Sequence, residues 1–180
     1  LLIALSSGTA SASSIGIFAN PGCSGTTLSI PPGAGKGTAY VSAALSPNDG
    51  TCASMSRIEF RIVGLPPGWS ATTVPSPAAT FVFGDPFSAG LIMGFFPHVT
   101  GTCIPVCTVT LTPPVSGDSA VLQVEAHQTP MSSAGPCPNV TPVCAPFHPL
   151  CVDGGTLLVD STVGVPSEPW RNVKVMYLQP

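Results

Sequence analysis

Seven cysteines are the residues with the clearest chemical potential in this chain. They are Cys23, Cys52, Cys103, Cys107, Cys137, Cys144 and Cys151. In an oxidising compartment such thiols pair, and an odd number leaves one thiol free or bound to another chain. Connectivity does not follow from sequence. We predict that Cys23 pairs with Cys52 and that two more bridges form among the other five, each contributing about 2–4 kcal/mol.

The closest approach to a metal-binding spacing is the run from Cys103 to Cys107. Zinc would accept two cysteines close together, but Pro105 between them also fits a tight disulfide loop, which we favour in an exported chain. The chain has no D-x-D-x-D-G calcium loop, and the acidic runs Asn48-Asp49-Gly50 and Asp153-Gly154-Gly155 are typical of turns. We therefore predict no metal and no cofactor.

Nucleophilic hydrolysis would require a histidine base beside an activated serine or cysteine. The three histidines, His98, His127 and His148, are scattered along the chain, and there is no G-x-S-x-G elbow. Nothing in their spacing predicts a triad, so no catalytic residue is assigned.

Glycoside hydrolysis would require two carboxylates about 5–10 Å apart. Most acidic residues of the chain lie in turns beside Gly or Pro, which leaves Glu59 and Glu125 as the candidates on strands. Both are expected to point outward to solvent, where Arg57 or Arg61 is available as an ion-pair partner. A secreted hydrolase that uses either one with a second acid is the least favoured of three functional hypotheses.

Glycan binding by a β-sandwich commonly relies on exposed aromatic side chains, and Trp69 and Trp170 are the candidate ligand contacts. Trp69 follows a turn and is either half-exposed or buried between sheets. The sequon Asn139-Val140-Thr141 marks an exposed loop if the source glycosylates such sites, and is otherwise a chance occurrence.

The overall composition excludes one class of partner. Charged residues make up 7% of the 180 residues, against roughly 25% in an ordinary soluble domain. The formal net charge is −3 with five basic residues, and phosphate binding needs clustered Lys and Arg, so we predict no nucleic-acid partner. A hydrophobic content of 44% argues against disorder.

The N-terminal residues indicate export. An apolar run, Leu1–Leu5, precedes Ala10-Ser11-Ala12, a small-x-small pattern of the kind that signal peptidase cleaves. We interpret residues 1–12 as the tail of a signal peptide and expect the mature chain to start near Ser13; a first β-strand is the alternative. No apolar run approaches the length of a transmembrane helix. The expected location is therefore extracellular, either secreted or on the cell surface.

From Ser14 onward, about ten short apolar runs are bounded by Gly, Pro, Asn or Asp, as is typical of strands. The predicted strands are Ser14–Ala19, Thr26–Ile30, Thr38–Leu45, Met55–Val63, Trp69–Val74, Thr80–Phe83, Leu91–Phe96, Cys107–Thr112, Ser119–Ala126 and Thr156–Asp160. With no helical crossover between them, they predict an all-β fold of two antiparallel sheets, an immunoglobulin-like, cohesin-like or jelly-roll sandwich.

The side-chain pattern of these runs also predicts which faces are buried. Ile58, Phe60 and Ile62 alternate with charged residues and should face the core. The runs Phe81-Val82-Phe83 and Leu91-Ile92-Met93 are apolar on both sides, so we expect them to be central or covered.

The sandwich is predicted to occupy residues 13–161. Within it, Thr129–Asp153 is a connection rich in Pro and Cys without alternation, which the disulfides should hold. Residues 162–180 then form a linker and a terminal segment, either a short helix capped by Ser167 or a last edge strand, Asn172–Leu178.

Several runs resemble a group of secreted β-sandwich proteins of environmental bacteria, which share a GLP-GW strand-turn, a C-terminal cysteine cluster and a W-x-x-V-K tail. The matching runs are Ile58–Trp69, Phe83–Gly90, Cys137–Cys144, Cys151–Val152, Gly154–Gly155 and Trp170–Tyr177. The resemblance implies secretion and no particular activity. In overall pattern the domain is also similar to cohesin-like and immunoglobulin-like domains of bacterial surface assemblies, which concerns the fold and not the function.

These observations favour a secreted or cell-surface structural or adhesive module that is not an enzyme. Its partner would be a copy of itself or another extracellular protein, bound at an unpaired strand edge. The N-terminal segment or Asn172–Leu178 could donate the added strand. A carbohydrate-binding module is the second hypothesis.

Overall fold

The computed structural model describes residues 13–31, 35–49, 51–114, 119–131, 135–144 and 148–161. Within these ranges the regular structure consists of thirteen β-strands. They are β1 Ser14–Phe18, β2 Thr27–Ser29, β3 Gly37–Ala44, β4 Ser54–Val63, β5 Ser70–Pro75, β6 Phe81–Asp85, β7 Gly90–Thr100, β8 Cys103–Thr112, β9 Ala120–Glu125, β10 Asn139–Thr141, β11 Leu150–Cys151, β12 Asp153–Gly154 and β13 Thr156–Asp160.

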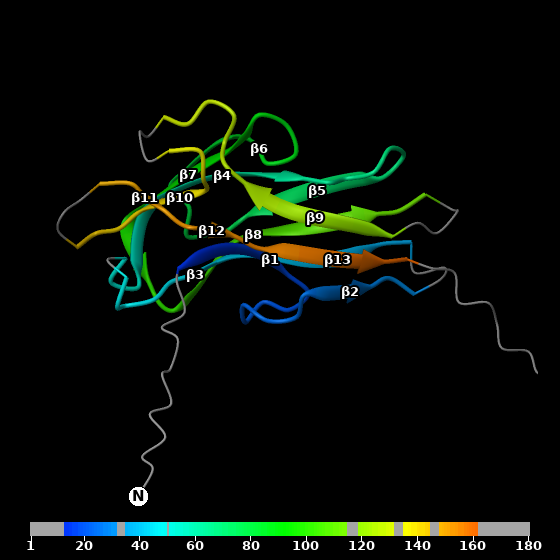
Figure 1. The fold of residues 1–180 in the computed structure, drawn as a ribbon, viewed down its shortest axis with the longest axis horizontal. Helices are drawn as coiled ribbons and strands as arrows, with labels where there is room; N and C mark the ends of the chain where they lie inside the picture. The colour runs from blue at the N-terminus through cyan, green and yellow to red at the C-terminus, as the bar shows by residue number, and fades with distance from the viewer. Residues whose placement is uncertain are drawn as a thin grey trace, which may run out of the picture.

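The strands form two sheets, which confirms the predicted all-β sandwich. One sheet has five strands in the order β12-β1-β3-β8-β5. The other has eight strands: the path β11-β10-β4-β9-β13-β2, with β7 paired to β4 and β6 paired to β7. Figure 1 shows the longer strands running along the long dimension of the domain.

Each of the ten predicted strands is present, and β7 and β8 are longer than expected. The additional strands are β10, β11 and β12, of two or three residues each, which lie in the connection that showed no alternation. Two pairings correct the expectation of purely antiparallel sheets, because β1 pairs with β12 and β13 pairs with β2 in parallel. Both join strands far apart in the sequence, so no short crossover connection is needed.

The core lies between the two sheets and contains the residues that alternation predicted. Ile58, Phe60 and Ile62 of β4 are at most 2% exposed, and Leu122 and Val124 of β9 are equally buried. All five belong to one cluster with the inward side chains of β1, β3 and β8. The period of two therefore identified the buried face of both strands correctly.

The structure corrects the predicted position of Glu59. Its side chain is on the outer face of β4 but is fully buried. It forms an ion pair with Arg57 and accepts a hydrogen bond of 3.1 Å from the backbone N–H of Met131. The chain around Met131, which follows β9, and the small strand β10 beside Glu59 exclude solvent. Neither covering segment is local in sequence, so the pattern of β4 did not reveal them.

Three disulfides hold the domain together, with pairings that differ from the prediction. Cys23 is bonded to Cys103, Cys52 to Cys144 and Cys137 to Cys151, so neither a Cys23–Cys52 bridge nor a Cys103–Cys107 loop forms. The first two bonds join residues 80 and 92 positions apart and tie distant strands together. The odd cysteine is Cys107, a buried free thiol.

The position of β6 is a further correction. Among the described residues nothing covers its run Phe81-Val82-Phe83: β6 pairs there with β7 alone, and each of its five residues is exposed. Leu91, Ile92 and Met93 in the neighbouring β7 are buried, as expected. The difference arises because β7 lies between β4 and β6, whereas β6 is the last strand on its side of the sheet.

Candidate functional site

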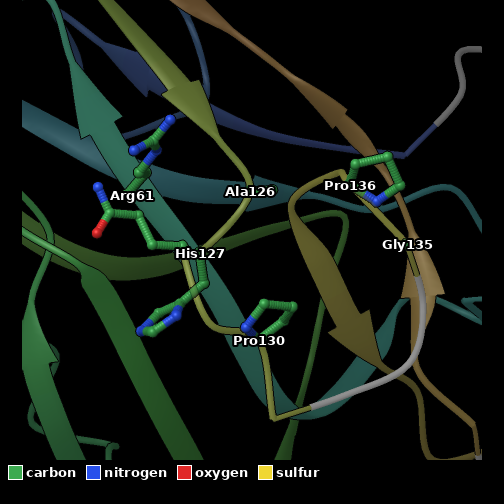
Figure 2. Close-up of a pocket in the computed structure, with 7 residues that line it drawn as sticks. Arg61, Ala126, His127, Pro130, Gly135 and Pro136 are labelled. Atoms are coloured by element: carbon green, nitrogen blue, oxygen red, sulfur yellow. The ribbon is translucent and has the colours of Figure 1, made fainter.

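One concave site lies where β4 and β9 meet the connection that follows β9. It encloses about 600 Å³ and is lined by Arg61, Ala126, His127, Gln128, Pro130, Gly135 and Pro136. Figure 2 shows that the polar ends of the Arg61 and His127 side chains are well separated and point away from each other. The polar groups therefore do not converge on one reacting atom, which nucleophilic or general acid–base catalysis would require.

The local contacts of the two side chains explain these orientations. Arg61 donates a hydrogen bond of 2.6 Å to the Glu125 carboxylate, its cross-strand neighbour on β9. His127 is 7% exposed, and its Nδ1 accepts a hydrogen bond of 3.1 Å from the backbone N–H of Thr129. Among the described residues that line it, none is a Ser, Thr, Cys, Asp or Glu that could act as nucleophile or acid. The residues of this hollow are consistent with structural roles.

A second hollow of about 530 Å³ adjoins the first and shares Arg61, Ala126 and Pro136 with it. Two carboxylates line it, Glu125 of β9 and Asp153 of β12. Glu59 does not line either hollow and has no exposed surface, so it cannot contact a substrate. Of the two strand carboxylates proposed for hydrolysis, the geometry excludes Glu59 and leaves Glu125 to be tested by activity.

The other residues singled out by sequence do not assemble into a site. Trp69 is 7% exposed and packs into the core, so the buried alternative holds and it offers no platform for a sugar. Trp170 lies outside the described residues, as do residues 1–12 and the remainder of 162–180. His98 and His148 are exposed and do not line the hollows described above. Asn139 is 1% exposed in β10, so its sequon does not mark an exposed loop.

Acidic turn residues hold the backbone, as their positions beside Gly and Pro indicated. Asp49 accepts hydrogen bonds from the backbone N–H groups of Ser13 and Thr51 and from the Thr51 hydroxyl. Burial tends to raise the pKa of Asp49, but these hydrogen bonds outweigh it and lower the pKa below 3.8. Among the described residues, no three His, Cys, Asp or Glu side chains gather as a metal site would require.

The least expected surface feature is a group of exposed aromatic side chains on β6 and β7. Phe81 is 53% exposed, Phe83 68% and Phe96 85%. Phe81 and Phe83 alternate on one face of β6, opposite Gly94 and Ile92 of β7. Because Phe95 faces the core, Phe96 projects from the same outer face. We call these three side chains the aromatic edge.

The neighbouring residues of β7 fix the aromatic edge in place. A Cβ atom at Gly94 would lie 1.9 Å from the Phe81 ring, so the glycine provides the space in which that ring lies against the sheet. Ile92 is 2% exposed although it is not part of the core between the sheets. Phe83 is its cross-strand neighbour, and such pairs stabilise a sheet face. The outer face thus carries its own small apolar layer.

The aromatic edge coincides with an open sheet edge. In the described part of the chain, β6 has no strand partner other than β7, so its far side presents backbone groups to solvent. Natural sheets usually protect such edges with charges, proline or a covering segment. β6 has one charged residue, Asp85, at its end, and no proline. An open edge beside exposed aromatic rings is suited to binding another strand.

Sequence reasoning identified the composition of β6 but not its exposure. The signal that was present is the run Phe81-Val82-Phe83, apolar on both sides and bounded by turns. A strand that is apolar on both faces is expected to be buried by other segments on both faces, and the described residues do not bury this one. Periodicity cannot say whether the cover belongs to the same domain or to a partner.

Comparison with known proteins identifies a fold and no family. No protein-family model matches the chain, and no curated protein sequence matches it. Among solved structures, a cohesin module from a family 33 glycoside hydrolase of Clostridium perfringens is 12% identical, with a TM-score of 0.51 over 83% of this chain and 98% of that one. A type I cohesin from Pseudobacteroides cellulosolvens is 7% identical over 85% and 95%, with a TM-score of 0.47.

At this identity the likeness to the Clostridium perfringens module concerns the fold alone. It supports the cohesin-like form of the predicted sandwich. The resemblance to secreted proteins of environmental bacteria stays a prediction. Within the described residues, no helix is long and apolar enough to cross a membrane. The chain has the fold of a cohesin-like β-sandwich.

Proposed function

We propose that this chain is an extracellular, non-catalytic structural module that associates with further copies of itself through the aromatic edge. The observation that carries the proposal is the exposure of Phe81 and Phe83 on β6, the edge strand of the described sheet, and of Phe96 on the adjoining β7. Scattered exposed apolar residues are ordinary, but a contiguous group on one face indicates an interaction surface.

The chemistry of the surface favours a protein partner. The exposed side chains of β6, Phe81, Val82 and Phe83, are apolar and could pack against another apolar strand. The backbone groups on the open side of β6 could form hydrogen bonds with that strand. A glycan-binding surface would be expected to expose Trp or Tyr rather than Phe, because Trp and Tyr combine an apolar ring with a hydrogen-bonding group. Trp69, which would have filled that role, is buried.

The cysteines support an extracellular location. Six of the seven are paired, and such disulfides persist in oxidising compartments. The solved structure with the similar fold is itself a module of a larger protein, a family 33 glycoside hydrolase, which supports a modular role without supplying the partner.

Sedimentation velocity over a rising series of protein concentrations tests the proposal. Wild-type protein should associate reversibly, and Phe83→Ser should weaken the association by about tenfold or more, since burial of a Phe ring contributes well over 1.4 kcal/mol. Val121→Ser is a matched control, because Val121 is 59% exposed on β9, away from β6. A wild-type monomer at every concentration, or equal weakening by both variants, would contradict the proposal.

A substrate panel tests the non-catalytic part. We expect no turnover of polysaccharides, esters or peptides. Turnover that disappears in Glu125→Gln and Asp153→Asn would show instead that the second hollow is an active site.

A further inference from the structure

The open edge of β6 has room for one more strand, and the character of β6 indicates what that strand must be. Phe81 and Phe83 are exposed on the outer face, while Val82, on the opposite face, is 42% exposed. A strand added here would therefore be apolar on both of its faces. It would also need to carry little charge, except near Asp85 at the end of β6.

We propose that the strand added to β6 is Asn172–Leu178 of a second copy of this chain. The inference rests on the proposed function and names the partner of the same surface. Asn172–Leu178 lies outside the described residues, and its sequence is Asn-Val-Lys-Val-Met-Tyr-Leu. Val173, Val175 and Tyr177 would lie on one face, with Lys174, Met176 and Leu178 on the other.

One antiparallel register pairs every outer-face side chain of the two strands. Lys174 opposite Asp85 brings together the charged residues of the two strands on the outer face. Met176 then lies opposite Phe83, and Leu178 lies opposite Phe81. Opposite charges and apolar pairs across strands are both stabilising.

The same register gives the inner face a consistent pattern. Tyr177 lies opposite Val82, which would cover the exposed side of that residue. Val175 lies opposite Gly84, which has a positive φ of 90° and approaches the Gly90 backbone oxygen too closely to carry a Cβ, so β6 offers no side chain to pair with Val175. The pairing of Tyr177 with Val82 therefore carries the inner face, and the register leaves no unpaired charge there.

The direction in which the chain leaves the sandwich favours a second copy over the same domain. The strand registers place Asp85 level with the Glu125 end of β9, whereas β13 runs toward the Ala120 end. Figure 1 shows the arrow of β13 pointing away from the part of the domain that holds β6. To reach its own β6, the chain would have to reverse and return about 20 Å along the strands.

Two prolines, Pro166 and Pro169, lie between Ser161 and Asn172. Each lacks the backbone N–H that a paired strand would donate, so the segment suited to pairing begins after them. Exchange of one strand between identical chains is a common route to association.

The experiment uses full-length chains that carry single substitutions. Met176→Asp places a charge opposite Phe83 and should weaken association by about tenfold or more, because an unpaired charge would be buried against a ring. Gln179→Asp adds the same charge outside the segment and should associate as wild type does. Phe83→Asp disrupts the acceptor edge instead.

Mixing separates the two roles. Met176→Asp retains an intact acceptor edge, and Phe83→Asp retains an intact donor segment, so each alone should be monomeric while their mixture forms a heterodimer in sedimentation velocity. If Met176→Asp associates like wild type while Phe83→Asp does not, the strand inference fails and the proposed function survives. If wild type does not associate, the proposed function fails. If hydrogen exchange shows residues 172–178 protected in wild-type monomers, the segment closes on its own domain and the second-copy assignment is overturned.

Discussion

Substitution of Glu59 by alanine tests how the outer face of the eight-stranded sheet is held together. The Glu59 side chain is fully buried and binds both Arg57 and the backbone N–H of Met131. Glu59→Ala would leave the Met131 N–H and the Arg57 guanidinium without these interactions. Loss of one partner from a buried ion pair typically costs about 3–5 kcal/mol.

The exposure of the arginine reduces that cost. Arg57 is 29% exposed, so water can solvate part of its charge after the substitution. We therefore expect a loss of about 2–3 kcal/mol in the free energy of unfolding, with a matching fall in Tm of roughly 5–10 °C. Urea denaturation with the disulfides intact measures the loss directly.

Glu125→Ala is the matched control on the same face. Its carboxylate pairs with Arg61, but the two side chains are 36% and 27% exposed, and exposed pairs contribute about 0–1 kcal/mol. Equal losses for the two variants would refute the reasoning, because they would mean that the chain around Met131 does not bury Glu59.

Three further predictions concern the cysteines and an acidic turn. Burial raises the pKa of the Cys107 thiol to about 12, so iodoacetamide at mildly alkaline pH should label no cysteine in the native protein and one after denaturation; labelling of native protein would show that Cys107 is accessible. Replacing both Cys52 and Cys144 by serine should cost about 2–5 kcal/mol in urea denaturation, because the bond constrains a long loop of the unfolded chain; an unchanged midpoint would show that this bond does not form. The pKa of Asp49 is lowered in the folded state, so its carboxylate stabilises the fold above the unfolded pKa, near 3.8, and this contribution disappears as the pH falls through the folded value. Asp49→Asn should therefore be less stable than wild type at neutral pH and equally stable in strong acid, and a difference independent of pH would contradict the assigned hydrogen bonds.

The alternation of apolar and polar residues was sufficient to predict the positions of the longer strands and the faces that they bury. The alternation around Ile58, Phe60 and Ile62 fixed both the extent of β4 and its buried face, because a half-buried strand has a period of two whatever lies around it. Turn residues between the runs then separated one strand from the next. The sandwich followed from the number of strands and the absence of helical connections.

Features that depend on distant segments were not predictable in this way. β10, β11 and β12 are too short to show alternation and exist because Cys137–Cys151 and pairing with other strands hold them. Cys23 meets Cys103 only once the sheets have formed. Glu59 has the pattern of an outward residue, and its burial depends on the chain near Met131.

The exposure of the aromatic edge could not be predicted from the sequence either. The run Phe81-Val82-Phe83 correctly predicted a strand, but its prediction that the strand is central or covered was wrong, because the described domain leaves β6 exposed at the edge of the sheet. A sequence pattern records that a surface is apolar and not which chain covers it. The proposed site of association is therefore the run that the sequence pattern predicted to be central or covered.

Hydrogen exchange of the Phe81–Asp85 amides at low and high protein concentration tests the central claim most directly. Association through this edge predicts that the amides pointing away from β7 are unprotected in dilute protein and become protected by about tenfold or more as the copies associate. Exchange rates in β6 that stay constant while sedimentation shows association would place the interface elsewhere and contradict the account.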